Sequence, residues 1–447
     1  MSTSWSRRRT TLALAGGLTA LILLPACGGG AAGSEGPVTL TYWGWTKGTK
    51  QAVDAFNAAH RDTKVRFEEI PSGTAGGYAK ISNAVKAGNA PDLVSVEYPT
   101  LPEFVSQGAI KDITPYVTPE LKEKLLPQAV RLTTLGGRNW AVPFDAAPHW
   151  AVPFDAAPQV YYYRKDFFTR HKIEVPRTWD DFRTAAAAAR KADPKARIGT
   201  FFPDDPTTFE AMAWQAGARW FATQGDSWKL DTTGPATRKV TAYWQGLLKD
   251  GLVHTHVSFS PGWTNSLRGG GTVGYLGASW GAGVLKGTLP DQSGKWAAAP
   301  VPTWDGRPAS GMLGGSTTAV TKSSRHAEAA VRFAAWMSTA PEAVRARVAS
   351  GESSAYPAAT ALRPVAKRAF DTRYYGGQDV YALFDAAAAS VNENWGWGPA
   401  TSTTNTTLKD EFGRAAGGAG SLADAVRAGS DATVRELRKR GLKVMGR

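Results

Sequence analysis

"PDLVSVEYPTLPEFVSQG" (residues 91–108) contains the pattern on which the fold depends. The apolar run "LVSV" (93–96) is short and bounded by polar residues, which is typical of a buried strand. Thr100 then opens a helical pattern as a predicted N-cap, and Gly108 ends that helix. A buried strand followed directly by a helix is the repeating unit of parallel α/β sheets.

The same unit occurs twice before this stretch. "VTLTYWGW" (38–45) and "TKVRFEEI" (63–70) alternate like strands, and residues 49–60 and 78–88 follow them with helical spacing. We therefore predict a parallel α/β sheet that begins at residue 38.

A second region repeats the alternation. Residues 159–168 are a predicted strand, and residues 178–192 are a predicted helix that opens with a capping box of Thr178 and Asp181. The chain has 447 residues, which is too long for one core, so we expect two α/β domains.

The N-terminus carries an export signal. Arg7, Arg8 and Arg9 precede an apolar stretch (12–24) that is too short to span a bilayer, and Cys27 follows. The site resembles a bacterial lipobox, so we predict a signal peptide (1–26), a lipidated Cys27 and a glycine-rich tether (27–37), with the protein on the outer face of the cell membrane. Cleavage by an ordinary signal peptidase remains the alternative, and both Sec and twin-arginine export stay open.

Composition narrows the function classes. Loss of the three leader arginines lowers the net charge from +14 to +11, and the remaining basic residues are spread out, so no nucleic-acid partner is expected. Because the one cysteine belongs to the lipobox, the mature chain has neither an intramolecular disulfide nor a cysteine nucleophile. Seventeen tryptophans exceed the usual need of a core and suggest a stacking surface.

Motifs for cofactors and catalysis are weak. "GGGTVG" (269–274) satisfies G-x-G-x-x-G, but a strand follows it where a dinucleotide site needs a helix. "HTH" (254–256) offers two imidazoles without a third ligand nearby, so neither a metal nor another cofactor is expected. A glycoside hydrolase would need paired carboxylates. None of the candidate acids lies in a motif that imposes such a role: Asp92, Glu97, Asp145, Asp155, Asp205, Asp305 and Glu393.

The order of motifs resembles the extracellular solute-binding proteins of ABC sugar importers, the maltose-binding-protein-like family. The resemblance covers nearly the whole mature chain. It is carried by "YWGW" (42–45), "AGNAPDLVSVEYPTLPEFVSQGAIKDITPYV" (87–117), "AVPFDAAPQVYYYRKDFF" (151–168), "TWDDF" (178–182), "GYLGASW" (274–280), "LGGSTTAVTKSSRHAEAAVRFAAWMS" (313–338) and "NWGWGP" (394–399).

The resemblance implies a two-lobed α/β fold of the periplasmic-binding-protein type (type II-like), with hinge crossovers and a ligand cleft between the lobes. It places lobe 1 in residues 38–145 and 315–372, and lobe 2 in residues 159–312 and 377–447. Closure of such lobes about a hinge reports ligand binding to the transporter.

The predicted ligand is a sugar, and an oligosaccharide is favoured. A pyranose has apolar faces that stack on aromatic rings and hydroxyls that need fixed donors and acceptors. On positions that match the family we expect tryptophans to stack, Glu97 and Asp155 to accept hydroxyl protons with Tyr98 beside them, and backbone amides to donate. The predicted contacts are Trp45, Glu97, Tyr98, Asp155, Trp263, Trp280, Gly314, Gly315, Trp395 and Trp397, and no catalytic residue is predicted.

One departure from the family lies at the first crossover. "WAVPFDAAP" stands at residues 140–148 and again at 150–158, with His149 between them, so residues 140–159 form a duplicated hinge segment. Ten added residues would extend a strand by roughly 33 Å, too far for a hinge, so one copy must lie outside the crossover. We expect the second copy in the crossover, with Asp155 rather than Asp145 facing the cleft.

The sequence thus predicts a monomeric, non-catalytic sugar receptor that delivers its ligand to ABC permease subunits and is held at the membrane by its lipid. Two alternatives remain open. One is a secreted glycoside hydrolase, and the other is a receptor of the same fold for a peptide or a phosphorylated polyol.

Overall fold

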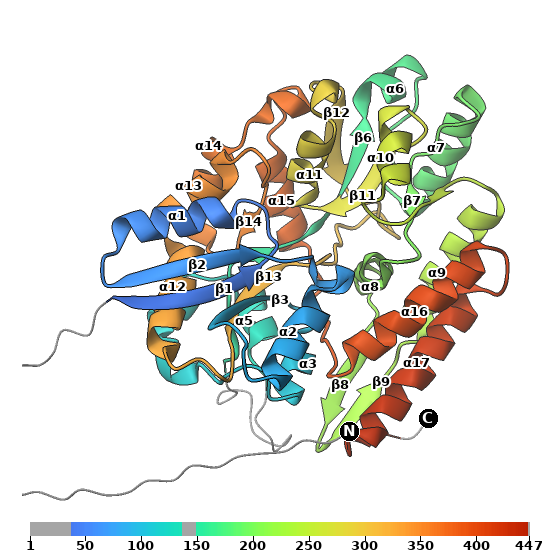
Figure 1. Ribbon diagram of the computed structural model, residues 1–447. Coiled ribbons are helices and arrows are strands. Elements are labelled where there is room, and N and C mark those ends of the chain that lie inside the picture. Colours follow the sequence, from blue (N-terminus) through green and yellow to red (C-terminus); the bar gives the residue numbers. More distant parts are fainter. Residues whose placement is uncertain (1–36, 136–148, 446–447) are drawn as a thin grey trace, which may run out of the picture. The chain divides into compact units, whose positions relative to one another are not determined.

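Residues 37–135 and 149–445 are described by the structure, a computed structural model (Figure 1). Its first sheet has the strand order β2-β1-β3-β13-β4 and defines what we call lobe 1. β1 pairs in parallel with β2 and β3, whereas β13 pairs antiparallel with β3. The parallel part confirms the unit predicted from residues 38–108. The strands are β1 (Val38–Gly44), β2 (Thr63–Glu69), β3 (Leu93–Glu97), β13 (Ser316–Val320) and β4 (Ala151–Pro153).

Helices cover both faces of this sheet. Phe56 of α1 and Phe333 of α12 pack with Tyr42 on one face. Ile81 of α2 and Phe104 of α3 pack on the other face. The helices of lobe 1 are α1 (Thr49–Ala59), α2 (Gly77–Lys86), α3 (Leu101–Ser106), α4 (Pro119–Glu123), α5 (Pro127–Thr133), α12 (Ala327–Thr339) and α13 (Pro341–Ala349).

The second copy of the duplicated segment runs from lobe 1 into the next sheet. Its β4 pairs with β13, and its β5 (Asp155–Ala156) pairs with β14 (Tyr356–Pro357). The first copy, with Asp145, lies outside the described residues. The structure therefore places Asp155 in the crossover, and the lobe boundaries given above stay a prediction.

The second sheet, which defines lobe 2, corrects two expectations. Its central strand β6 (Gln159–Arg164) pairs antiparallel with both neighbours, β11 (Gly274–Ala278) and β12 (Trp296–Pro300), so this sheet is not parallel. β6 directly follows the crossover strand β5 along the chain and runs opposite to β11 and β12. The predicted strand 159–168 is also too long, because Lys165 begins helix α6 (Lys165–Arg170).

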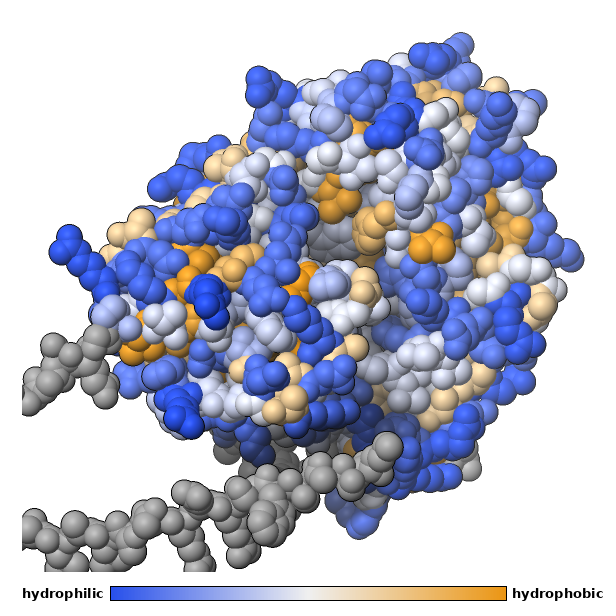
Figure 2. All heavy atoms as spheres, viewed as in Figure 1, coloured by the Kyte–Doolittle hydropathy of each residue, from blue (hydrophilic) through white to orange (hydrophobic). Residues whose placement is uncertain are grey.

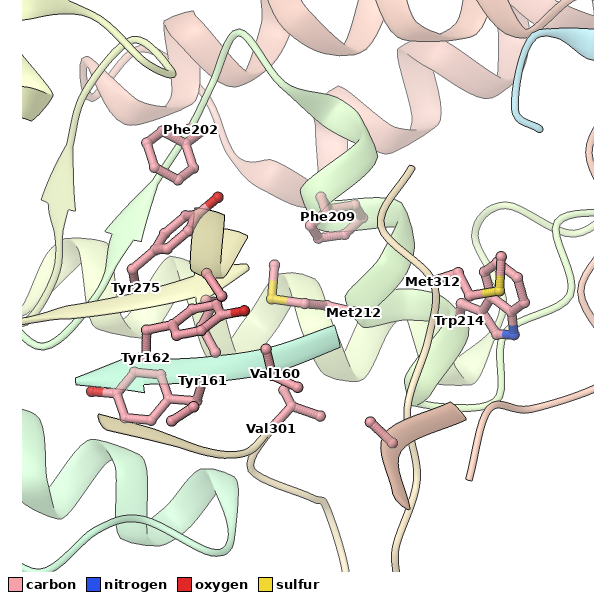
Figure 3. Close-up of a cluster of buried hydrophobic side chains, with 14 of the residues drawn as sticks. Val160, Tyr161, Tyr162, Phe202, Phe209, Met212, Trp214, Tyr275, Val301 and Met312 are labelled. Atoms are coloured by element: carbon pink, nitrogen blue, oxygen red, sulfur yellow. The ribbon is translucent and has the colours of Figure 1, made fainter. Parts of the chain in front are cut away.

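Aromatic side chains fill the core of lobe 2. Tyr162 of β6 stacks on Tyr275 of β11 with ring centroids 6.0 Å apart, and both belong to the buried cluster of Figure 3, which also contains Met212 and Phe209. The remaining helices are α7 (Trp179–Ala192), α8 (Pro206–Gln215), α9 (Pro235–Lys249), α10 (Pro261–Arg268), α11 (Gly281–Thr288), α14 (Arg363–Ala369), α15 (Val380–Ala389), α16 (Thr401–Ala416) and α17 (Leu422–Lys439). The remaining strands are short and form two small separate sheets: β7 (Thr200–Phe201), β8 (Phe221–Gln224), β9 (Ser227–Leu230), β10 (His254–Thr255) and β15 (Lys443–Val444).

The helix caps follow the sequence in one case and differ in another. Thr178 and Asp181 form the predicted capping box, in which each side chain accepts the other residue's backbone N–H. Thr100 makes no side-chain cap. Its backbone is already helical (φ −99°, ψ −13°), so its hydroxyl is not placed as an N-cap requires.

Candidate functional site

The lobe 1 side of the site lies where β1 and β3 end. Parallel strands bring their carboxyl ends to one edge of a sheet, so Trp45 after β1 and Glu97 at the end of β3 share that edge. Tyr78 of α2 joins them: its hydroxyl donates to Oε2 of Glu97 over 2.6 Å, and its ring meets the Trp45 ring edge-on at 5.5 Å. The result is a carboxylate held beside two aromatic rings.

Glu97 is electrostatically unusual. Burial raises the pKa of its carboxyl to about 6, the hydrogen bond from Tyr78 opposes this shift, and the charge of Asp205 adds to it. Glu97 forms no ion pair with any of the described residues. A half-buried carboxylate without a cationic partner is suited to accepting hydrogen bonds from a neutral ligand.

The chain returns from β12 of lobe 2 to β13 of lobe 1 through Gly314 and Gly315, which we call the second crossover. This crossover lies between the two sides of the site. A Cβ on Gly314 would lie 3.6 Å from Nε1 of Trp280 and 3.7 Å from Oε1 of Glu97, so the indole of lobe 2 and the carboxylate of lobe 1 meet at this glycine. Both glycines have left-handed backbones, with φ of 81° and 94°. Neither backbone N–H donates to another described residue.

Tyr98 lies under this crossover. A Cβ on Gly315 would be 2.7 Å from the Tyr98 ring, so a glycine is required there. The Tyr98 hydroxyl donates to the carbonyl of Asp155 over 2.9 Å, and the side chain is fully buried. Tyr98 thus contacts the first crossover at Asp155 and the second crossover at Gly315. Its role as a ligand contact stays a prediction.

Asp155 lies in the first crossover and also contacts the chain just after the second. Its Oδ1 accepts the Ser316 N–H over 2.6 Å and so joins the first crossover to the start of β13. Burial raises the pKa of Asp155 to about 7, against the opposing influence of the Ser316 hydrogen bond and the charge of Arg347. Only 4% of the residue is exposed, which leaves little surface for a ligand.

The lobe 2 side of the site is aromatic. Trp280 follows β11, is partly exposed, and donates from Nε1 to the Leu313 carbonyl over 2.8 Å, which fixes its ring. Trp263 packs against Tyr275, with ring centroids 5.3 Å apart, and is only 1% exposed, and Tyr275 in turn lies 6.5 Å from Trp280. Of these two predicted stacking residues, Trp280 offers a ring surface and Trp263 is buried in the core.

Trp395 and Trp397 lie elsewhere in lobe 2. Trp395 stacks on Trp214 of α8 at 5.4 Å with the rings nearly parallel, and Trp397 meets Trp395 edge-on at 5.1 Å. They are 4% and 7% exposed. The structure shows them as core residues, and their contact with a ligand remains a prediction.

Tyr78, Phe259 and Asp205 lie beside predicted contacts and were not themselves predicted as ligand contacts. Asp205 accepts hydrogen bonds from Thr207 and Thr208 at the start of α8, and burial raises the pKa of its carboxyl. Phe259 lies edge-on to Trp280. No motif marks Asp205 as a ligand contact: "DDPTT" (204–208) is typical of a helix N-cap, and in the structure Asp205 makes no side-chain cap hydrogen bond.

Other kinds of site find no support in the described part of the chain. No group of three or more His, Cys, Asp or Glu residues is placed to hold a metal there. None of its helices combines the length and apolar character needed to cross a bilayer. On the face that Figure 2 shows, apolar residues form small separate patches on a hydrophilic surface.

Comparison with known proteins agrees with this geometry. Residues 42–344 match the family model described as bacterial extracellular solute-binding protein. The arabinooligosaccharide-binding protein of Bacillus subtilis (strain 168) is 25% identical over 322 residues, 68% of this chain and 70% of that protein. The lactose-binding protein of Rhizobium radiobacter is 25% identical over 313 residues, 66% of this chain and 69% of that protein.

Solved structures give the same result. The galacto-N-biose-/lacto-N-biose I-binding protein from Bifidobacterium longum, in complex with lacto-N-biose, has a TM-score of 0.80 and 26% identity, covering 92% of this chain and 99% of that one. A binding protein from B. animalis subsp. lactis, in complex with β-1,6-galactobiose, has a TM-score of 0.80 and 26% identity, covering 92% and 100%. The two-lobed fold and the non-catalytic class expected from the sequence are confirmed. The chain belongs to the family of bacterial extracellular solute-binding proteins.

Proposed function

We propose that the chain is the carbohydrate receptor of an ABC importer and that its ligand is a neutral oligosaccharide. The observation that carries the proposal is the meeting of Trp280 and Glu97 at Gly314. An aromatic face, a carboxylate without a cation and free backbone donors together match the apolar face and the hydroxyls of a sugar. The relatives named for oligosaccharides and lactose, and the neighbours solved with disaccharides, support the same ligand class.

The charge of the site argues against an anionic ligand. The charge of Asp205 raises the pKa of Glu97, the charge of Asp204 raises that of Asp205, and no lysine or arginine of the described residues offsets the pKa of Glu97 or Asp205. A phosphate group would therefore meet repulsion. A phosphorylated polyol thus fits less well than a neutral sugar, despite the basic net charge of the whole chain.

A thermal-shift screen separates the ligand classes, because a ligand that binds only the folded state raises the melting temperature. The panel holds arabinobiose, lactose, lacto-N-biose, β-1,6-galactobiose, two tripeptides and a phosphorylated polyol. We expect a rise with at least one saccharide and none with the tripeptides or the phosphorylated polyol. Stabilisation by a peptide alone would contradict the proposal, and conversion of a saccharide at an enzymatic rate would favour a hydrolase.

Binding is expected to depend on the ionisation of Glu97. Its pKa of about 6 means that the carboxylate is charged at pH 7.5 and becomes neutral as the pH falls through 6. Sugar hydroxyls donate more strongly to the charged form, so affinity should fall between pH 7.5 and pH 5. Titrations across this range check the trend. Glu97→Gln should bind more weakly at pH 7.5 and lose the part of the slope centred near pH 6, whereas a slope centred near pH 7 belongs to Asp155. An unchanged slope in that variant would exclude Glu97.

We also propose that the exported chain is anchored by a lipid on Cys27 and binds permease subunits as a monomer. The lipobox-like sequence before Cys27 and the extracellular character of the family support this. Mass spectrometry of the membrane-bound protein should find an N-terminal peptide that begins at lipidated Cys27. An unmodified N-terminus at that residue would contradict the anchor.

A further inference from the structure

Phe259 combines two features that a purely structural residue avoids. It lies in the loop between β10 and α10, and 52% of it is exposed. Its backbone is left-handed, with φ of 53°. That conformation is costly for a bulky side chain, and glycine or asparagine would adopt it far more easily. A strained, exposed aromatic residue is therefore a reason to look for a function.

The comparison with Lys172 sharpens this point. Lys172 and Phe259 are the two described non-glycine residues with positive φ. Lys172 follows His171, the C-cap of α6, and the next amide, that of Ile173, donates back to the Phe168 carbonyl, so its conformation ends a helix. Phe259 instead occupies the third position of a turn in which the Ser260 N–H donates to the Val257 carbonyl over 3.3 Å, and glycine or asparagine is the usual residue where that position has a positive φ.

The loop is held on both sides of Phe259. Ser258 donates from its backbone N–H and from its hydroxyl to the carboxylate of Asp204, over 2.9 and 2.6 Å. Ser260 caps α10 by accepting the Trp263 N–H. These bonds anchor the loop on both sides of the exposed Phe259 ring.

The ring lies beside the predicted stacking residue. Phe259 contacts Trp280 edge-on at 5.9 Å with an interplanar angle of 60°, and it contacts Trp263 at 5.5 Å. Two planes inclined at 60° cannot both lie flat against one face of a single sugar ring. They can contact two successive rings of a bent chain, one on each plane.

We infer that Phe259 is a second stacking residue of the ligand site and that it makes the receptor prefer saccharides of two or more rings over monosaccharides. This rests on the proposed function and adds a length preference to it. A docking surface for a permease is the competing use of an exposed ring. The contact with Trp280, which itself meets Glu97 at Gly314, favours the ligand.

The test is calorimetric titration of the full mature chain with the tightest-binding disaccharide of the panel above and with its component monosaccharides. Phe259→Ala should weaken disaccharide binding about tenfold, since it removes a partly buried ring contact, and should change monosaccharide binding less than twofold. The matched control is Val257→Ala in the same loop, where the exposed fraction is 57%, and it should change neither.

A second variant separates binding from folding. Phe259→Gly suits the left-handed backbone, so it should raise the melting temperature while it weakens disaccharide binding. Equal loss for monosaccharide and disaccharide, or disaccharide binding within twofold of the parent in Phe259→Ala, would overturn the inference. Unchanged binding with lost uptake would assign the ring to docking instead. If no saccharide binds the parent chain, the proposed function itself fails.

Discussion

Trp280→Ala should weaken saccharide binding by about 1–3 kcal/mol, a loss of roughly five- to 150-fold in affinity. The indole supplies a partly exposed ring at the end of β11, and its Nε1 hydrogen bond to the Leu313 carbonyl holds that ring at the second crossover. Alanine removes the stacking face and the bond together. Calorimetric titration of both proteins with the same disaccharide measures the difference.

Two further variants show whether the loss belongs to the site. Trp280→Phe keeps an aromatic face without the donor and should recover part of the affinity. Trp336→Ala removes a partly buried tryptophan of α12 that packs on Phe56 and His60, so it should lower stability without changing affinity. Unchanged affinity in Trp280→Ala would remove Trp280 from the site.

Glu103→Ala should lower the free energy of unfolding by about 1–3 kcal/mol, because it removes a nearly buried carboxylate together with its hydrogen bond from the Ser402 N–H and its ion pair with Arg440. Glu103 lies on α3 and is 4% exposed. Its Oε2 accepts the Ser402 N–H at the start of α16 over 2.8 Å, and its Oε1 pairs with Arg440 over 3.3 Å. One carboxylate of the N-terminal region thus holds the C-terminal helices.

Urea unfolding measures this change, with the transition followed by both circular dichroism and fluorescence. The matched control is Glu411→Ala, which removes a surface pair with Arg414 and should cost less than about 0.5 kcal/mol. A Glu103→Ala protein as stable as the parent would show that the contact between α3 and α16 contributes little to folding.

The sequence predicted the parts of the fold that local patterns encode. The alternation in residues 38–108 gave β1, α1, β2, α2, β3 and α3 within a few residues of their observed bounds. The direction of β6 could not be predicted in this way, because strand pairing depends on where the crossover delivers the chain. The sequence also predicted that Asp155 lies in the crossover. It could not predict the hydrogen bond from the Ser316 N–H to Asp155, because the two residues are 161 positions apart.

The site shows the same division. The resemblance to the family predicted Trp280 and Glu97 as ligand contacts, and the structure places both at the ends of strands, where ligands of α/β folds bind. A count of tryptophans cannot separate a stacking ring from a core ring, so Trp263, Trp395 and Trp397 were grouped with Trp280 although all three are buried. The positive φ of Phe259 leaves no signal in composition or periodicity, so the sequence did not point to this residue.

Calorimetric titration of the mature chain with the saccharide panel tests the central claim most directly. We expect saturable heat with a disaccharide at a stoichiometry near one per chain, full recovery of the unaltered sugar, and no heat with tripeptides or a phosphorylated polyol. A chain that binds none of the saccharides but binds a peptide or a phosphate ester would contradict the account.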